Sequence, residues 1–265
     1  VVAVMMASAM SLVLAQNQAS AITYPDSGFV TPAQAPFVVT MWAVNETHDR
    51  AADGFLCTGE LLDKFTVMIA AHCIEAAGNE SFVFVRGQDT KTARGEVLFA
   101  SSVTVHPKYD PVNIANDIAL VNLYYPASSS VYLSIPDATI EKTILKNRPT
   151  LYGWGLLHRG LQTKRLVKAR LRDMKAEGLE NFPETFNPKL ELAAGRANAN
   201  GTFTGACSGD SGAPLVGSVA KKTYVIGVVS YGLDSTCESS TPTIFTRVAA
   251  YAKWIASIRV EHIKS

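Results

Sequence analysis

The sequence predicts an all-β fold that is closed by one C-terminal helix. Short runs rich in β-branched and aromatic residues recur along the chain and are separated by turn residues. Strands of this length and spacing are typical of a sandwich or a barrel, and not of alternating β and α units. One stretch near the C-terminus has instead the apolar period of a helix. The 265 residues, of which 48% are hydrophobic, suffice for one large β domain or two small barrels.

Each expected element follows from a local pattern. The strands are expected at residues 37–42, 67–70, 82–85, 118–121 and 224–229. Proline and polar residues between 125 and 137 predict a crossing between two halves of the chain. Lysine and arginine alternate with apolar residues over 164–172, which we interpret as the wet face of a strand and not as a binding patch. Helical spacing places one set of apolar side chains on a common face, namely Val248, Tyr251, Ile255 and Ile258.

An apolar segment of signal-peptide length opens the sequence. Residues 1–15 are apolar and small, and Ala19, Ser20 and Ala21 provide the small residues at which signal peptides are cut. We therefore predict a secretory signal peptide at 1–21, cleaved after Ala21, and a secreted protein. A membrane anchor is the alternative, but it needs about twenty unbroken apolar residues, more than this segment contains.

Four cysteines agree with export, because disulfides persist in oxidising compartments. They are Cys57, Cys73, Cys207 and Cys237, and spacing alone leaves all three pairings open. A zinc site is the competing interpretation, but no two cysteines have the close spacing that metal sites favour, and the five histidines are scattered. Between residues 82 and 99 the carboxylates are too few for a calcium site. We expect no metal.

Three short segments carry the chemistry. Residues 70–73 read Ala-Ala-His-Cys, 116–120 read Asn-Asp-Ile-Ala-Leu, and 209–214 read Gly-Asp-Ser-Gly-Ala-Pro. They contribute His72 as a base, Asp117 as an orienting carboxylate and Ser211 as a nucleophile, which together let a serine hydroxyl attack a carbonyl at neutral pH. The order histidine, aspartate, serine excludes the α/β-hydrolase fold, in which the nucleophile comes first.

These segments resemble those of the trypsin/chymotrypsin family of serine endopeptidases, and the resemblance runs from about Ile22 to the last helix. It implies a protease domain at 22–265 made of two packed six-stranded antiparallel β-barrels, at about 22–130 and 131–247, with a C-terminal α-helix at about 248–260. The active site would then lie in the cleft between the barrels. The resemblance also implies the disulfides Cys57–Cys73 and Cys207–Cys237.

The resemblance assigns roles to the residues around the nucleophile. Backbone N–H groups of Gly209 and Ser211 would form the oxyanion hole. Asp210 would pair with the α-amino group that activation cleavage releases in this family, since a buried carboxylate is costly without a cation. The family's usual Ile/Val-Val-Gly-Gly start is absent here, so we hypothesise that signal removal exposes Ile22 as that terminus, with no separate zymogen step. The alternative is that Ile22 simply begins a strand.

The primary substrate pocket is predicted by counting from these landmarks. Gly205 falls at its base, where a trypsin-like enzyme carries an aspartate, and Thr243 falls at a wall position, where it should shorten the slot. We therefore expect cleavage after small to medium uncharged residues. Gly232 leaves the other wall open, so a preference for larger apolar residues stays open, and an inward-facing Glu238 would restore some basic preference.

The segment Ser230, Tyr231 and Gly232 matches the one that pairs with the substrate backbone as an added strand, with Tyr231 in place of the usual tryptophan. The predicted function is thus a secreted serine endopeptidase that acts through an acyl-enzyme. The alternatives are a catalytically inactive homologue that serves as a binding module, and an active protease with trypsin-like basic specificity. We expect a monomer with protein or peptide substrates, with proteinaceous inhibitors as candidate partners. No nucleic-acid partner is expected, since the net charge is only +1. We also expect no organic cofactor, because the triad chemistry needs none, and no membrane partner after signal removal.

Overall fold

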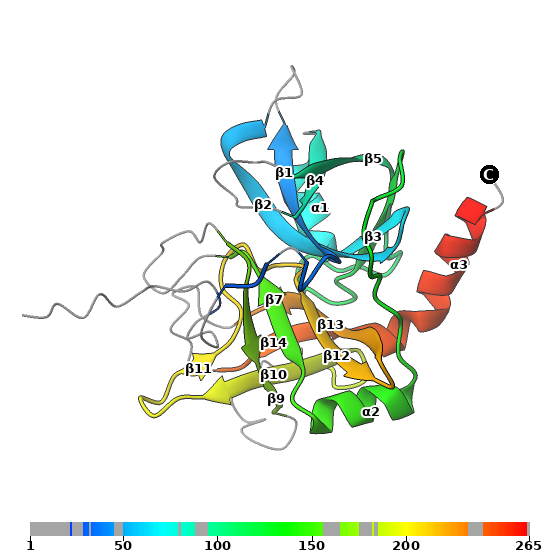
Figure 1. The fold of residues 1–265 in the computed structure, drawn as a ribbon. Coiled ribbons are helices and arrows are strands. Elements are labelled where there is room, and N and C mark those ends of the chain that lie inside the picture. Colours follow the sequence, from blue (N-terminus) through cyan, green and yellow to red (C-terminus); the bar gives the residue numbers. More distant parts are fainter. Residues whose placement is uncertain are drawn as a thin grey trace, which may run out of the picture.

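The computed structural model describes residues 22, 29–31, 33–44, 50–78, 81–87, 95–155, 165–174, 182, 185–232 and 241–263. The predicted signal peptide, Cys237 and Glu238 lie outside these residues. Within them the all-β class is confirmed, since two antiparallel sheets make up most of the structure and a helix follows the last strand. Figure 1 shows the two sheets stacked on each other, the first in blue to green and the second in green to orange-red.

The first sheet is a closed six-stranded barrel in the order β1-β2-β3-β6-β5-β4. Its strands are β1 (Val38–Val44), β2 (Arg50–Asp63), β3 (Thr66–Ile69), β4 (Phe82–Arg86), β5 (Glu96–Val105) and β6 (Ala119–Leu123). The expected runs in this half lie within or overlap β1, β3, β4 and β6. A short helix, α1 (Ala71–Ala77), follows β3 directly.

The second sheet is barrel-like and runs in the order β11-β10-β14-β13-β12-β7-β8, with β9 paired beside β10. Its strands are β7 (Thr150–Gly153), β8 (Val167–Arg170), β9 (Arg172–Asp173), β10 (Glu191–Ala197), β11 (Phe203–Thr204), β12 (Pro214–Val219), β13 (Lys222–Tyr231) and β14 (Thr243–Arg247). The β12–β13 hairpin turns through Ala220 and Lys221, both at positive φ, as a two-residue type I′ turn requires.

The chain crosses from the first sheet to the second between β6 and β7, through the proline-containing stretch. The N–H of Leu133 donates to the Leu61 carbonyl and that of Ser134 donates to the Thr223 carbonyl, so the crossing is bonded to both sheets. A helix that the sequence analysis did not expect, α2 (Ala138–Lys146), follows the crossing. Asp137 caps its first turn by accepting two backbone N–H groups, and Ile144 packs on β12.

The C-terminal helix is confirmed. It begins as a 3₁₀ turn, η3 (Val248–Tyr251), and continues as α3 (Ala252–Ile263). The predicted face is the buried one, because Val248, Tyr251 and Ile255 are at most 4% exposed and Ile258 packs on the same core. None of the helices in the described residues is long and apolar enough to cross a membrane.

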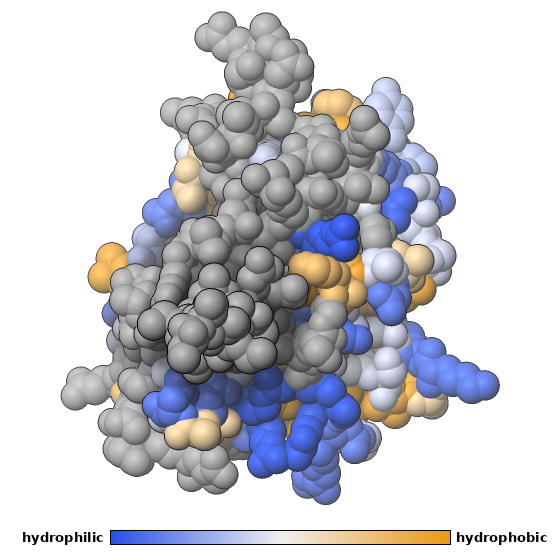
Figure 2. Space-filling model, turned by 60° about the vertical axis from the view of Figure 1, so that its left-hand side comes forward, coloured by the Kyte–Doolittle hydropathy of each residue, from blue (hydrophilic) through white to orange (hydrophobic). Residues whose placement is uncertain are grey.

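The basic segment also has the predicted form. Val167 and Ala169 are buried, whereas Lys168 and Arg170 alternate with them on the more exposed face of β8. Figure 2 shows that, on one face of the molecule, the described hydrophobic residues appear as separate patches between hydrophilic ones. Single exposed apolar residues are normal on a protein surface and by themselves indicate no binding site.

The largest core cluster joins the two sheets. It combines the interior of the first barrel with Val216, Val225 and Val228 of the second sheet and with the apolar face of the C-terminal helix. Burial at this joint fixes the position of one sheet relative to the other, which matters because the predicted site residues come from both.

Candidate active site

His72 is the second residue of α1, and Asp117 lies in the turn before β6. The His72 ring donates from Nδ1 to Asp117 Oδ2 over 2.8 Å, and the His72 backbone N–H donates to Oδ1 over 2.9 Å. The Asp117 side chain is fully buried, whereas that of His72 is 27% exposed. The carboxylate therefore fixes both the ring and the backbone of His72. On the other edge of the ring, Nε2 lies 3.8 Å from the disulfide-bonded sulfur of Cys73.

Asp117 is also bonded to the second sheet. Ser230 of β13 donates its hydroxyl to Asp117 Oδ2 over 2.5 Å, and the Thr246 hydroxyl of β14 donates to the Asp117 carbonyl over 2.7 Å. A buried carboxylate is stable only when donors surround it. Here the donors come from α1 and β13, so the bonds that satisfy Asp117 also hold the two sheets together at the site.

Ser211 lies in a turn between two glycines, both of which have backbone conformations that only glycine adopts easily. Gly209 has φ +89° and Gly212 has φ +79°. Gly212 also passes close to the first barrel, since a Cβ there would lie 2.3 Å from the Thr58 carbonyl oxygen and 3.2 Å from the Ala70 nitrogen. The N–H of Thr58 donates to the Ser211 carbonyl over 2.9 Å. The turn is thus placed against the residues that lead into His72.

The described residues contain no hydrogen bond between the Ser211 hydroxyl and His72. Such a bond is often long before substrate binds, and it tightens in the reacting complex. The structure therefore brings His72, Asp117 and the Ser211 turn into one site, with the bond between His72 and Asp117 already made.

Two backbone N–H groups of the turn are left for a ligand. Those of Asp210, Gly212 and Ala213 donate to protein carbonyls. In the described part of the chain, those of Gly209 and Ser211 donate to no protein acceptor. The Thr58 hydroxyl donates to the Gly209 carbonyl over 3.0 Å and so fixes the orientation of that peptide. Two fixed and unpaired donors beside a serine are suited to bind an oxygen that gains negative charge.

Asp210 is completely buried behind this turn. Its carboxylate accepts the backbone N–H groups of Gly155 over 2.7 Å and of Cys207 over 3.0 Å, and the backbone N–H of Ile22 also donates to it. Burial raises the pKa of Asp210 to about 7, although these three hydrogen bonds lower it. Ile22 is itself 0% exposed and packs in the core of the second sheet, so the structure places the predicted terminus beside Asp210.

Gly153 and Gly155 are site residues whose role was not recognised in the sequence. A Cβ on Gly153 would lie 1.9 Å from an Asp210 oxygen, and one on Gly155 would lie 2.6 Å from the Asp210 carboxyl carbon. Both positions therefore require glycine for Asp210 to fit. The only local signal in the sequence is the pair of glycines on either side of Trp154.

The predicted pocket residues Gly205 and Thr243 lie together. The Thr243 hydroxyl accepts the N–H of Ala206 over 2.8 Å, and a Cβ on Gly205 would lie 2.5 Å from that hydroxyl oxygen. Thr243 thus fills the space into which a side chain at position 205 would extend. This end of the predicted pocket is closed by an uncharged hydroxyl group.

The predicted substrate segment ends β13. Ser230 is buried under the site, Tyr231 is half-buried and pairs with Ile244 of β14, and Gly232 is exposed. The Tyr231 hydroxyl donates to Glu191 Oε1 over 3.3 Å. Glu191 did not figure in the sequence analysis, because nothing in its local sequence indicates that it lies beneath Tyr231.

The cysteines in the described part of the chain are oxidised. Cys57 and Cys73 form a disulfide that attaches α1 to β2 beside His72, and Cys207 is also disulfide-bonded. Its expected partner, Cys237, lies outside the described residues. Cys57, Cys73 and His72 bring potential metal ligands within 4.8 Å of one another, but the two sulfurs are bonded to each other and cannot act as thiolate ligands.

The chain is similar in sequence to several known proteins. The sequence profile of the Trypsin family matches residues 29–255. The chain is 31% identical over 235 residues to a chymotrypsin of Phaedon cochleariae, covering 85% of this chain and 78% of that protein. It is 30% identical over 213 residues to trypsin eta of Drosophila melanogaster, with 78% of each chain covered. A trypsin-like protease of Streptomyces glaucescens is 32% identical over 208 residues, covering 76% of this chain and 73% of that protein.

Proposed function

Because the chain belongs to the trypsin family of serine endopeptidases, we propose that His72, Asp117 and Ser211 are its catalytic triad. The observation that carries this proposal is the buried Asp117 carboxylate, which binds the His72 ring while the Ser211 turn is seated beside α1. In the neutral ring, the Nδ1–H bond to Asp117 selects the tautomer in which Nε2 carries the lone pair that a general base needs.

The reaction follows from these positions. Ser211 Oγ attacks the substrate carbonyl carbon while His72 Nε2 accepts the hydroxyl proton. The carbonyl oxygen becomes negatively charged and is bound by the N–H groups of Gly209 and Ser211, and each such donor contributes about 3 kcal/mol to the transition state. His72 then gives its proton to the leaving amine as the C–N bond breaks. Water attacks the resulting acyl-enzyme by the same route, which releases the acid and restores Ser211.

The primary pocket favours small to medium uncharged residues before the scissile bond. Gly205 contributes no charge, and the Thr243 hydroxyl occupies the space above it. Among the described residues, no carboxylate lies at this end of the pocket to pair with a substrate arginine or lysine. The relatives carry the names trypsin and chymotrypsin alike, so their names do not decide between the basic and the apolar alternatives.

We further propose that the protein is secreted and that removal of residues 1–21 activates it. The signal-like composition of that segment and the disulfide beside His72 support export. The position of Ile22 supports the proposal that this cleavage activates the protein, because its backbone N–H already donates to Asp210. Cleavage would turn this amide into an ammonium group. Ile22 also has φ +58°, a conformation that is costly for a β-branched residue, and a terminal residue has no φ torsion.

A serine-directed phosphonate tests the triad. The secreted, processed protein is expected to be labelled once, on the tryptic or chymotryptic fragment that contains Ser211, and to lose peptidase activity in proportion. Ser211→Ala should abolish labelling, whereas Ser208→Ala, which changes an exposed serine three residues away, should not. An unlabelled but folded wild-type protein would favour the alternative of an inactive homologue that acts as a binding module.

A further inference from the structure

Tyr231 is hydrogen-bonded to a buried carboxyl group, that of Glu191. Its hydroxyl donates to Glu191 Oε1 over 3.3 Å, and the side chain of Thr185 makes a further hydrogen bond to it. Glu191 is only 8% exposed, and the next three residues of its strand are buried and apolar. A carboxyl group in such surroundings is costly unless it is hydrogen-bonded. The hydrogen-bond partners of the Glu191 carboxyl group therefore indicate its role in the structure.

The second oxygen of Glu191 binds the turn that precedes β10. Oε2 accepts the N–H of Asn187 over 2.6 Å, so the two oxygens of one carboxyl group join this turn to Tyr231. Burial raises the pKa of Glu191, while the bonds from Asn187 and Tyr231 lower it. Glu191 thus links the turn before β10 to the Tyr231 side chain and has little contact with solvent.

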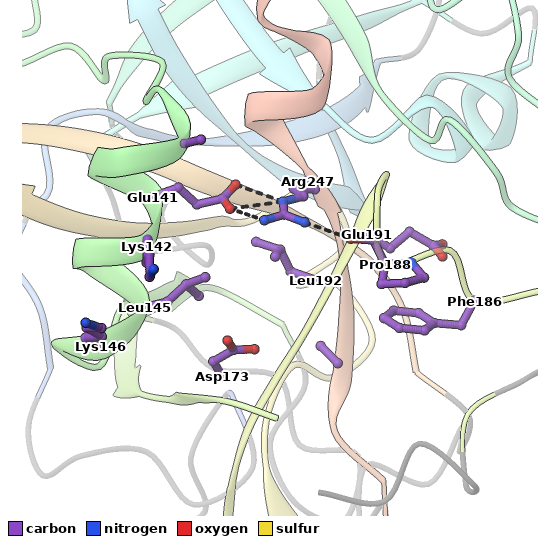
Figure 3. Close-up of a pocket in the computed structure, with 12 residues that line it drawn as sticks. Glu141, Lys142, Leu145, Lys146, Asp173, Phe186, Pro188, Glu191, Leu192 and Arg247 are labelled. Carbon is purple, nitrogen blue, oxygen red and sulfur yellow. Dashed lines mark hydrogen bonds and ion pairs between the residues drawn. The ribbon is translucent and has the colours of Figure 1, made fainter. Parts of the chain in front are cut away.

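The turn itself is fixed from the opposite side. Arg247, at the end of β14, donates from its side chain to the Pro188 carbonyl over 2.7 Å and from its backbone to the Leu190 carbonyl over 2.8 Å. Its guanidinium group forms an ion pair with the buried Glu141 of α2. Figure 3 shows this pair facing a cavity of about 520 Å³, with Pro188 and Glu191 beyond Arg247. The carboxyl group of Glu191 is therefore held in place independently of Tyr231.

The Tyr231 ring is held by packing as well. It lies against a small cluster of Met174, Ala193 and Ile244, together with Phe182 and Phe186, whose rings stack with centroids 4.9 Å apart. Packing around the ring and the hydrogen bond at its hydroxyl therefore both hold Tyr231. A tryptophan, which the family usually carries here, would fill the space by size and needs no such bond.

We propose that Glu191 is a positioning residue that holds Tyr231 as the wall against which the peptide upstream of the scissile bond lies. This rests on the proposed function and on the prediction from the sequence that residues 230–232 pair with the substrate. Glu191 does not touch the reacting atoms, so it should affect the binding of long substrates and leave the chemical step unchanged.

Two substrates with the same residue before the scissile bond separate these effects. A single-residue ester occupies only the primary pocket, whereas a tetrapeptide amide also reaches Tyr231. We expect Glu191→Leu to raise the KM of the tetrapeptide about tenfold, as for loss of a hydrogen bond to a charged group, with kcat and the ester kinetics unchanged. Glu191→Gln should restore the wild-type KM, because an amide can accept from Asn187 and donate to the Tyr231 oxygen.

Removing the other partner gives a second, independent measurement. Tyr231→Phe deletes only the hydroxyl and should reproduce the effect of Glu191→Leu, and the double variant should be no worse than either single variant. Tyr231→Phe also keeps the test valid if Glu191→Leu fails to fold. Tyr132→Phe is the matched control, because it removes a tyrosine hydroxyl that donates to the Ala127 carbonyl in the crossing segment.

Phosphonate titration of Ser211 gives the concentration of active sites in each variant. Equal KM values for wild type and Glu191→Leu, additive effects in the double variant, or equal losses on ester and tetrapeptide would overturn the inference while leaving the triad intact. A wild-type protein that does not label would instead overturn the proposed function, and this inference with it.

Discussion

The clearest quantitative prediction concerns the bond between Ile22 and Asp210. The perturbation is to retain Ala21, so that residue 22 offers a peptide N–H and no charge. The pKa of Asp210 is then raised from 3.8 to about 7 by burial. The shift is about three units, and each unit corresponds to about 1.36 kcal/mol, so ionised Asp210 costs the fold about 4 kcal/mol.

The direction of the pH dependence follows from the sign of this shift. A carboxyl group whose folded pKa is raised stabilises the fold below its unfolded pKa, and this contribution is lost as the pH rises through the folded pKa. The chain that retains Ala21 should therefore lose about 4 kcal/mol between about pH 4 and pH 7. In the chain that starts at Ile22, the ammonium group lowers the pKa of Asp210, and most of this loss should disappear.

The assay is urea unfolding of both chains from pH 4 to pH 8, each carrying Ser211→Ala to prevent self-cleavage. A fusion partner that is removed to leave Ile22 first provides the processed form. Asp210→Asn in the longer chain is the control and should remove its extra pH dependence. If the two chains lose stability in parallel across this range, Ile22 does not act as the partner of Asp210, and the reasoning is refuted.

Three further predictions concern the pocket, the disulfide and a buried acid. Thr243→Gly should open the slot and shift the preference toward larger apolar residues in a peptide-library profile, whereas a wild-type preference for arginine or lysine would contradict the pocket assignment. Replacing Cys57 and Cys73 by alanine should lower the free energy of unfolding by about 3 kcal/mol, since the bond closes a loop with a sequence separation of 16, and an unchanged thermal midpoint would count against it. Glu60 is fully buried, neither of its carboxyl oxygens has a hydrogen-bond partner among the residues that the structure describes, and burial raises its pKa. In denaturant titrations, Glu60→Met should therefore stabilise the protein by about 1–3 kcal/mol at pH 8 and by less at pH 4. A loss of stability at pH 8 would show instead that the carboxyl group has a partner.

Local pattern predicts the elements of this fold better than their arrangement. The strand runs and the apolar face of Val248, Tyr251 and Ile255 could be read from residue type and period alone. Helix α2 was missed because it has only nine residues. Its capping residue Asp137 and the four-residue spacing of Ile140 and Ile144 were signals that could have indicated it.

The residues of the candidate site also differ in how far the local sequence predicts them. His72, Asp117 and Ser211 stand in short sequence motifs from which their proposed roles could be predicted. Residues such as Thr58 and Glu191 carry no local signal, since their roles depend on contacts across long sequence separations. Thr58, for example, meets Gly209 across 151 positions. Only the packing of the two sheets shows which distant residues support the turn and the substrate segment.

The central claim is that His72 and Ser211 act as one catalytic unit. The most direct test compares kcat for His72→Ala, Ser211→Ala and the double variant on one peptide substrate. We predict that each single variant loses about six orders of magnitude and that the double variant is no slower, because either loss alone disables the unit. A double variant whose loss equals the product of the two single losses, or a Ser211→Ala variant that retains activity, would contradict the account.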